Sequence, residues 1–218
     1  MASTDIPLHD LLAEVRACQC CVDLPLGPRP VVRAESSATI MVIGQAPGTR
    51  VHASGIPWDD LSGDRLRSWM GLSREQFYDA SRIAIMPMGF CYPGRGKSGD
   101  LPPRRECAPL WHRTILEQLP QIRLTLLIGQ YAQGYYLNDG YRSLTERVSH
   151  WGDYLPALLP LVHPSPRNRR WLANNPWFEA QLVPFLQSEV ARSFLSHKMV
   201  GIGRDYPDKD RVHTPGKN

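Results

Sequence analysis

The chain has 218 residues, of which 42% are hydrophobic and 21% charged, and its formal net charge is +4. That length suits one domain with a buried core, and those fractions exclude wholesale disorder, while the small positive charge permits polyanion binding without demonstrating it. No apolar run approaches 18 residues and the first residues (MASTDIPLHDLLAEV) lack a signal peptide's continuous apolar stretch, so we expect a cytoplasmic protein without a membrane span.

Apolar periodicity predicts an alternation of helices and strands along the chain. Leu11, Leu12 and Val15 lie at helical spacing and predict a short amphipathic helix over 8–18. Continuous apolar runs, typical of buried parallel strands, occupy residues 38–43, 83–88, 124–128 and 158–162. Helical patterns lie at about 64–80, 106–119 and 130–138, and a last one begins near residue 175. The alternation predicts an α/β fold: a three-layer α/β/α arrangement around a central four-stranded, mostly parallel sheet.

We expect residues 1–197 to form the domain. Residues 198–218 have little apolar content and no periodicity, so we expect them to form a flexible tail.

Two loops stand out as the places where a ligand would bind. Ligands of parallel α/β sheets bind at the carboxyl ends of the strands. The first predicted strand leads into GQAPGTRVHASGIPWDDLSGD and the fourth into HPSPRNRRW. These two loops should face one crevice.

Five cysteines occur in a chain without a secretion signal, so disulfides are not expected. Cys18 and Cys21 form a C-x2-C pair, and Cys91 and Cys107 lie 16 residues apart. Four thiolates from two distant segments can close on a metal ion or an iron–sulfur cluster. The alternative is that Cys91 and Cys107 are small buried hydrophobic residues, as free cysteines often are.

Two glycine-rich stretches invite a phosphate-binding interpretation. Residues 44–48 (GQAPG) lack the G-x-G-x-x-G spacing of a dinucleotide site, although glycines that flank a proline allow close backbone approach to a ligand. The alternative is a tight strand-to-helix turn. Residues 94–98 (GRGKS) do not form a Walker loop, because Cys91 stands where its first glycine is required.

The two loops also carry aromatic, acidic and basic side chains. Trp58 can stack on a flipped base, and Asp59 or Asp60 can orient water or stabilise a developing cation. The alternative is that Asp60 or Ser62 caps the following helix. His163 begins a proline-stiffened projection. Basic side chains that could meet phosphates follow it or lie nearer the last cysteine: Arg167, Arg169 and Arg170, with Arg104 and Arg105 as further candidates.

In order and separation, three segments resemble the uracil-DNA glycosylase superfamily: residues 44–48 (GQAPG), 55–63 (GIPWDDLSG) and 163–168 (HPSPRN). The cysteine spacing, with Glu106-Cys107-Ala108-Pro109 at its end, resembles the iron–sulfur branch of that superfamily, called family 4. The resemblance implies a [4Fe–4S] cluster on Cys18, Cys21, Cys91 and Cys107, with Cys20 left over; Zn is the alternative.

The resemblance also implies a mechanism for base excision. Pro166 and Arg167 would form a wedge that displaces a damaged base, which then stacks on Trp58, and His163 would donate a hydrogen bond to the departing base. A carboxylate or amide would activate water toward the sugar C1′. The base- and DNA-binding residues implied are Gly44, Gln45, Ala46, Pro47, Gly48, Trp58, Ser165, Pro166, Arg167 and Asn168, and the catalytic ones are His163, Asp60 and Asp59.

The active site departs from the family pattern at three places. Gln45 and Ala46 stand where relatives carry the residue that handles water, and Pro87 lies in a segment that lacks the uracil-reading asparagine. Asp59 and Asp60 replace apolar or glycine positions, and another branch places its catalytic aspartate nearby, so we expect Asp60 to have the water-handling role.

These features favour a monomeric, monofunctional DNA glycosylase that acts in base-excision repair on DNA with a uracil or related deaminated base. Two other interpretations stay open. One is a catalytically weak DNA-binding protein that retains the glycosylase scaffold. The other is an unrelated cysteine-metal α/β enzyme that acts on a small nucleoside.

Overall fold

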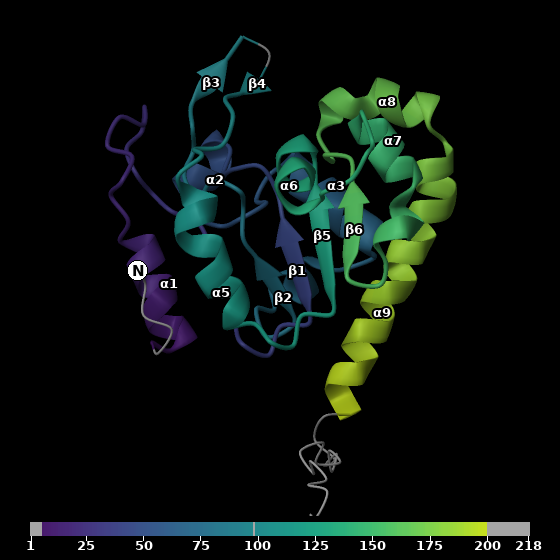
Figure 1. Ribbon diagram of the computed structural model, residues 1–218, viewed down its shortest axis with the longest axis horizontal. Helices are drawn as coiled ribbons and strands as arrows, with labels where there is room; N and C mark the ends of the chain where they lie inside the picture. Colours follow the sequence, from purple (N-terminus) through teal and green to yellow (C-terminus); the bar gives the residue numbers. More distant parts are fainter. Residues whose placement is uncertain (1–5, 98, 200–218) are drawn as a thin grey trace, which may run out of the picture.

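The central element is a four-stranded sheet in which every neighbouring pair of strands is parallel, in the order β2-β1-β5-β6 (Figure 1). The computed structural model describes residues 6–97 and 99–199. The strands of the sheet are β1 (Ile40–Ile43), β2 (Ile83–Ile85), β5 (Leu124–Ile128) and β6 (Leu158–Leu161). The predicted three-layer α/β/α fold is confirmed, because helices cover both faces of this sheet.

The helices connect and flank the strands. The α-helices are α1 (Leu8–Arg16), α2 (Thr49–Ser54), α3 (Leu61–Met70), α4 (Arg74–Phe77), α5 (Arg113–Glu117), α6 (Gln130–Tyr136), α7 (Leu144–Ser149), α8 (Arg169–Asn174) and α9 (Val183–Met199). Short 3-10 or π turns are η1 (Ala108–His112), η2 (Trp151–Tyr154), η3 (Pro166–Asn168) and η4 (Phe178–Leu182). A two-stranded antiparallel hairpin, β3 (Arg95–Gly96) with β4 (Gly99–Asp100), stands apart from the sheet.

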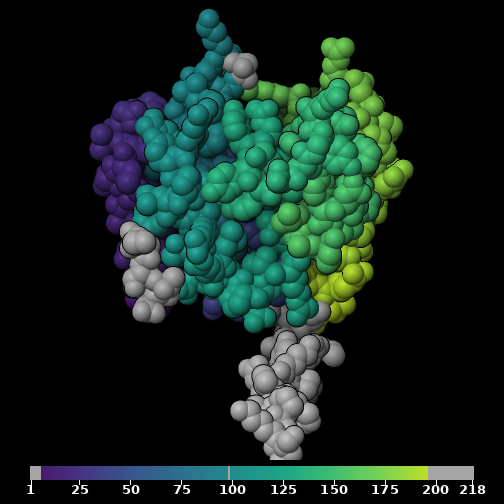
Figure 2. Space-filling model, in the orientation of Figure 1, coloured from purple at the N-terminus to yellow at the C-terminus, as the bar shows by residue number. Residues whose placement is uncertain are grey.

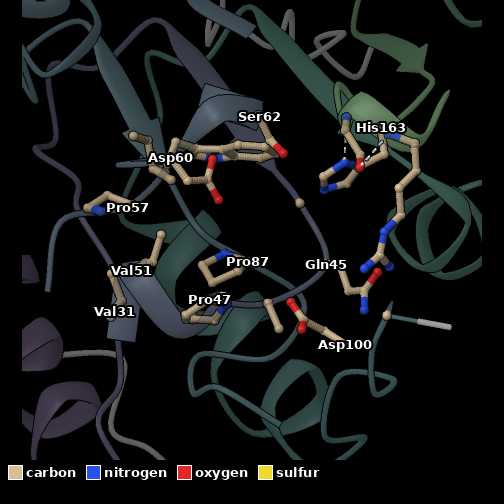
Figure 3. A pocket seen from close by; sticks show the side chains of 18 of the residues that line it. Val31, Gln45, Pro47, Val51, Pro57, Asp60, Ser62, Pro87, Asp100 and His163 are labelled. Carbon is tan, nitrogen blue, oxygen red and sulfur yellow. Dashed lines mark hydrogen bonds between the residues drawn. The ribbon is translucent and has the colours of Figure 1, made fainter. Parts of the chain in front are cut away.

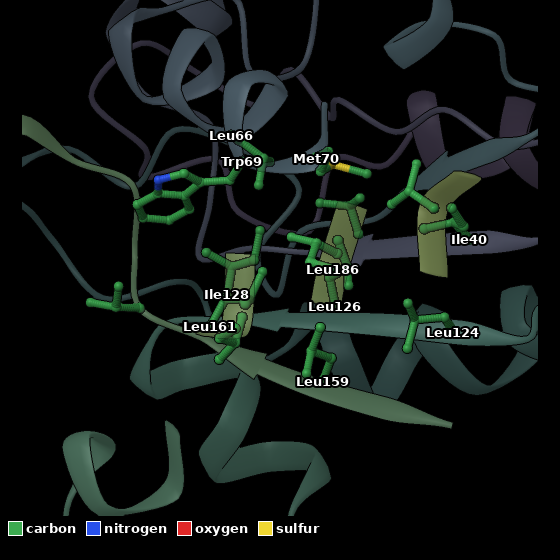
Figure 4. Packing of buried hydrophobic residues seen from close by; sticks show 14 of the residues in the cluster. Ile40, Leu66, Trp69, Met70, Leu124, Leu126, Ile128, Leu159, Leu161 and Leu186 are labelled. Carbon is green, nitrogen blue, oxygen red and sulfur yellow. The ribbon is translucent and has the colours of Figure 1, made fainter. Parts of the chain in front are cut away.

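Two cores form because successive side chains of a strand point to opposite faces. From β1, Ile40 and Val42 join the core that α3 and α9 cover, whereas Met41 and Ile43 join the core beneath α1, α5 and α6. Figure 4 shows the first of these, in which Leu66, Trp69 and Met70 of α3 and Leu186 of α9 pack on the sheet. The strands are therefore buried on both faces, which explains their continuous apolar sequences.

The predicted elements are present with altered bounds. The pattern over 64–80 divides at Gly71, whose φ of 67° ends α3. α4 follows, with Ser73 as its N-cap and a capping box formed by Ser73 and Gln76. The apolar run over 83–88 is a strand only to residue 85, although the N–H of Met86 and Met88 still donate to the β1 segment. Sequence patterns did not reveal α2, α7 or α8.

The single domain predicted for residues 1–197 stays a prediction, and most of the tail predicted for 198–218 lies outside the described residues. Within residues 6–97 and 99–199, no helix combines the length and the apolar character needed to cross a membrane.

Candidate functional site

The loops that follow β1 and β6 face one pocket of about 570 Å³ at the carboxyl ends of the strands. The single crevice expected from the sequence is thus present. In Figure 2 the β3–β4 end and the α8 end rise on either side of a depression in the upper edge. The pocket is lined by residues of both loops and of four neighbouring segments: Val31, Gly44, Gln45, Ala46, Pro47, Gly48, Val51, Pro57, Trp58, Asp60, Ser62, Ile85, Pro87, Gly99, Asp100, Gln130, His163, Ser165, Arg167 and Asn168.

Trp58 is held in the pocket by a tight turn braced from behind. Its φ of 57° is unusual for a residue with a side chain, and its carbonyl accepts a hydrogen bond from the buried Arg67 guanidinium at 3.3 Å. Gly63 lies so close that a Cβ there would overlap the Trp58 carbonyl. A Cβ on Gly44 would lie 2.7 Å from the indole, so the lack of a side chain lets the ring rest against β1. The strain and the two close approaches fix the position of the indole.

His163 lies beside this indole, with 5.6 Å between the ring centroids (Figure 3). Its Nδ1 accepts a hydrogen bond from the Ser165 N–H at 3.1 Å, so the neutral ring carries its proton on Nε2. Burial lowers the pKa of His163, and the negative charge of Asp60 opposes part of that effect. A neutral imidazole with a free donor nitrogen is therefore available near neutral pH.

The rest of the HPSPRN loop orients His163. Asn168 donates from Nδ2 to the His163 carbonyl at 2.7 Å, and Ser165 Oγ accepts from the Arg167 N–H at 3.2 Å. Pro166 begins the short 3-10 turn and does not line the pocket, whereas Ser165, Arg167 and Asn168 do. The loop is thus a rigid support whose polar side chains hold its own backbone.

The two adjacent carboxylates have different positions. Asp60 lines the pocket and also caps α3, because its Oδ1 accepts from the Gly63 N–H at 2.9 Å. The capping role and the pocket role anticipated for Asp60 thus coexist. Asp59 lies outside the pocket and accepts a hydrogen bond from Arg74 at 2.8 Å, which lowers the pKa of its carboxyl. Of this pair, Asp60 alone is placed to act on a ligand in the pocket.

The first loop is fixed by polar contacts on both sides. The Gly44 and Gln45 carbonyls accept hydrogen bonds from the N–H of Met88 and Gly89, at 2.8 and 3.0 Å. The Gln45 amide donates from Nε2 to the Leu101 carbonyl at 3.0 Å. The Gln45 side chain therefore holds the base of the β3–β4 hairpin.

Two polar residues of the pocket, Asp100 and Gln130, were not singled out from the sequence. Asp100 comes from the β3–β4 hairpin, far from the three motifs, and directs its carboxylate inward (Figure 3). The pattern G-x-G-x-x-G-D over 94–100 signals a glycine-rich turn that ends in an acid, but it cannot say where the turn folds. A side chain at Gly99 would collide with the Arg167 guanidinium, so the hairpin and the HPSPRN loop meet at the pocket rim.

The expected basic residues do not share one environment. Arg167, Arg169 and Arg170 are exposed at the β6 end of the pocket. The expectation that Arg104 contacts DNA is wrong, because its guanidinium forms ion pairs with Asp23 at 2.9 Å and with Glu106 at 3.2 Å. It thereby neutralises acids that flank the cysteines.

All five cysteines are free thiols that line a second, small pocket where the segment after α1 meets the loop after β2 and the start of η1. Burial raises the pKa of the Cys91 and Cys107 thiols to about 11, and the charges of Cys18 and Cys21 add to this effect. Cys20, the residue left over in the family comparison, lines the pocket as well but is exposed. Cys91 and Cys107 are both buried in hydrophobic clusters, so the alternative that they are small buried hydrophobic residues stays open, although both cysteine segments meet here.

Metal binding is not itself supported by the arrangement of these thiols. In the part of the chain that is described, no three His, Cys, Asp or Glu side chains are grouped to hold a metal ion. A Zn²⁺ ion needs every sulfur about 2.3 Å away, so its four ligands must converge on one point. The sulfurs here instead line the wall of a pocket that apolar residues close, among them Phe90, Leu110 and Trp111.

A comparison with protein families agrees with the fold and the pocket. The family model described as the uracil DNA glycosylase superfamily matches residues 32–187, well over half of the chain. The matched segment contains the four-stranded sheet and all residues of the pocket at the strand ends except Val31. It begins after the C-x2-C pair, so it does not address the cysteines of the first segment. The chain belongs to the uracil DNA glycosylase superfamily.

Proposed function

We propose that the protein is a monofunctional DNA glycosylase that hydrolyses the N-glycosidic bond of a flipped uracil or related deaminated base. Membership of the superfamily supports glycosylase-type action on DNA in general. The observation that carries the proposal is that Trp58, His163 and Asp60, which come from two distant loops, line one pocket at the sheet edge. Together they supply an aromatic surface, a hydrogen-bond donor and an anion.

The donor and the anion suit the charges that develop as the bond breaks. The electron pair of the C1′–N bond leaves with the base, which becomes anionic, and His163 donates to it from Nε2. The sugar becomes cationic, and Asp60 stabilises it while its other oxygen stays in the helix cap. The oxygen of water then bonds to C1′, and the proton it loses passes to a carboxylate of the pocket.

The base-binding wall is largely apolar. Val31, Val51, Ile85 and Pro87 line it, and Pro87 offers no N–H while its carbonyl contacts His112 Nε2 at 3.1 Å. Recognition of the base therefore relies on shape, on stacking against Trp58 and on backbone groups. A pocket of this kind does not demand one base, which is why the proposal extends to related deaminated bases.

The test is single-turnover cleavage of oligonucleotides that carry uracil, hypoxanthine, xanthine or a thymine mismatch. We expect cleavage of at least one substrate, and a fall of roughly 10²–10³-fold in its rate for His163→Ala, because a positioned donor to the leaving group is lost. For Trp58→Ala we expect weaker base binding first, since stacking contributes about 1–3 kcal/mol per base. A wild-type protein that cleaves none of the four substrates overturns the proposal.

A second candidate is a DNA-binding protein with little glycosylase activity. It is favoured by Gln45, whose amide is occupied with the Leu101 carbonyl and carries no charge to stabilise the sugar. Salt-sensitive DNA binding without turnover on the same four substrates would support this candidate over the first.

We further propose that Cys18, Cys21, Cys91 and Cys107 hold a [4Fe–4S] cluster with a structural role. Support comes from the meeting of both cysteine segments in one sulfur-lined pocket, separate from the base pocket. Such a cluster would fasten the amino-terminal segment to the loop after β2. We expect brown protein as purified, with about four irons per chain. Cys107→Ser should lose the iron and the colour, whereas Cys20→Ser should retain both. Colourless protein with one zinc per chain would replace the cluster with a Zn site.

A further inference from the structure

Asp100 is held at the pocket rim by a tethered hairpin. β3 and β4 pair with Arg95 opposite Asp100, and the Leu101 N–H donates to the Gly94 carbonyl at 2.9 Å. The Leu101 carbonyl accepts a hydrogen bond from the side-chain amide of Gln45 at 3.0 Å. The residue that follows Asp100 is therefore fixed to the first pocket loop, which limits how far the carboxylate can move.

Asp100 and Asp60 approach each other over Gly48. A Cβ built on Gly48 would lie 3.6 Å from Asp100 Oδ2 and 3.9 Å from Asp60 Oδ2, so both oxygens border the same small space. Figure 3 shows the two carboxylates entering the pocket from different sides. The absence of a side chain at residue 48 leaves the space that both oxygens border open.

Burial favours Asp100 as a proton acceptor. Partial burial raises the pKa of its carboxyl above the ordinary value; the guanidinium groups of Arg167 and Arg95 act against this, and the negative charge of Asp60 adds to it. A carboxylate with a raised pKa is a stronger base than an ordinary one. Asp60 differs, because one of its oxygens is committed to the Gly63 N–H.

We propose that Asp100 is the general base of the reaction, acting on a water molecule held between its carboxylate and that of Asp60. This inference rests on the proposed glycosylase function. The water oxygen bonds to C1′ as the C1′–N bond breaks, the base leaves with the electron pair of that bond, and the water proton moves to Asp100. The departed base takes up a proton from solvent, and Asp100 releases its own, so the cycle is closed. Asp60 does not take part in this proton transfer and faces the sugar.

The first test compares single-turnover rates on the best substrate from the panel, over a pH range from 5 to 9. We expect Asp100→Asn to lower the rate by roughly 10²-fold or more, because the proton acceptor is lost. Its affinity for DNA with an abasic-site analogue should stay within about threefold of wild type. Asp10→Asn is the matched control: it removes the same charge from an exposed residue on α1, and its rate should not change.

The pH profile of the rate distinguishes proton transfer by Asp100 from a purely structural role of this residue, because a structural role would leave the profile unchanged. The wild-type rate should fall as the pH decreases through the pKa of Asp100, because the protonated carboxyl cannot accept a proton. Asp60→Asn should move this acid limb to lower pH, since the neighbouring negative charge is gone. In Asp100→Asn the limb should be absent.

Chemical rescue distinguishes the loss of the carboxylate from misfolding of the variant as the cause of lost activity. Asp100→Gly should be inactive in buffer, and added formate, a small carboxylate, should restore part of its rate. If wild type is active but Asp100→Asn loses less than threefold in rate, or if Asp100→Gly is not rescued, the inference fails and the proposed function stands. If wild type cleaves no substrate, both fail.

Discussion

At the scale of single residues, the pocket is supported by a buried histidine, His112, that does not itself line it. His112 is 1% exposed; its Nδ1 lies 2.6 Å from the Tyr136 hydroxyl and its Nε2 3.1 Å from the Pro87 carbonyl. The carbonyl can only accept, so Nε2 carries the proton and Nδ1 accepts from the tyrosine. A neutral ring therefore ties the base-facing Pro87 to α6.

Because His112 is buried as a neutral ring, we expect the folding stability of the protein to depend on pH. Burial lowers the pKa of His112 to about 4, below the 6.5 of an unfolded histidine, so the unfolded chain binds a proton that the folded one excludes. The stabilisation is complete above pH 6.5 and is lost as the pH falls toward 4. The resulting loss in the free energy of unfolding between pH 7.5 and pH 5 is about 2 kcal/mol. Urea unfolding of wild type and His112→Gln at both pH values measures it.

In the His112→Gln variant this part of the pH dependence should disappear, although the variant itself is expected to be less stable at pH 7.5. Equal losses of unfolding free energy in both proteins between the two pH values would contradict the assignment of the neutral ring.

At the scale of elements, the start of α3 joins folding to chemistry. Asp60 caps the helix with one oxygen and lines the pocket, while Gly63 in the first turn accommodates the Trp58 carbonyl. The cap, the stacking residue and the carboxylate therefore depend on one helix terminus. A substitution there changes stability and catalysis together unless it is chosen to separate them.

Two substitutions of Asp60 make that separation. Asp60→Asn retains an N-cap oxygen, so its free energy of unfolding should stay within about 0.5 kcal/mol of wild type, whereas Asp60→Ala should lose about 0.5–2 kcal/mol. Both remove the negative charge, so both should lower the single-turnover rate by roughly 10²-fold or more. Denaturant unfolding and cleavage assays on the same preparations check this. An Asp60→Asn protein of undiminished rate would show that Asp60 acts only as a cap.

The same scale explains what could be predicted from the sequence. The meeting of the GQAPG and HPSPRN loops was predictable, because both follow parallel strands and such strands end at one edge. The place of Asp100 was not, because it depends on a hairpin that folds back through the Gln45–Leu101 contact, across 56 residues. Arg104 was misjudged for a similar reason: its partner Asp23 is 81 residues away. Local patterns specify elements, whereas these side chains are placed by long-range polar contacts.

At the scale of the whole molecule, the arrangement separates two tasks. The thiol pocket lies where the segment after α1 meets the loop after β2 and the start of η1, and the base pocket opens at the carboxyl ends of the strands. Of the candidate cations, Arg104 belongs to the first region and Arg167, Arg169 and Arg170 to the second. Because the net charge is only +4, attraction to DNA must come from where these arginines are placed and not from the total charge.

That placement makes the salt dependence of binding diagnostic. A protein that neutralises phosphates releases counterions, so its affinity for DNA falls as salt is added. On duplex DNA each phosphate contact makes the slope of log affinity against log salt steeper by about 0.9. We expect Arg169→Gln and Arg170→Gln each to reduce the magnitude of this slope by about one. Each should also weaken binding to the same extent for all DNA sequences. Arg113→Gln is the matched control, because it removes the same charge from α5, where Arg113 pairs with Glu117 at 2.8 Å. Fluorescence anisotropy from 50 to 200 mM salt measures all three. If the control lowers the slope as much as the α8 variants do, the DNA does not lie over the pocket mouth.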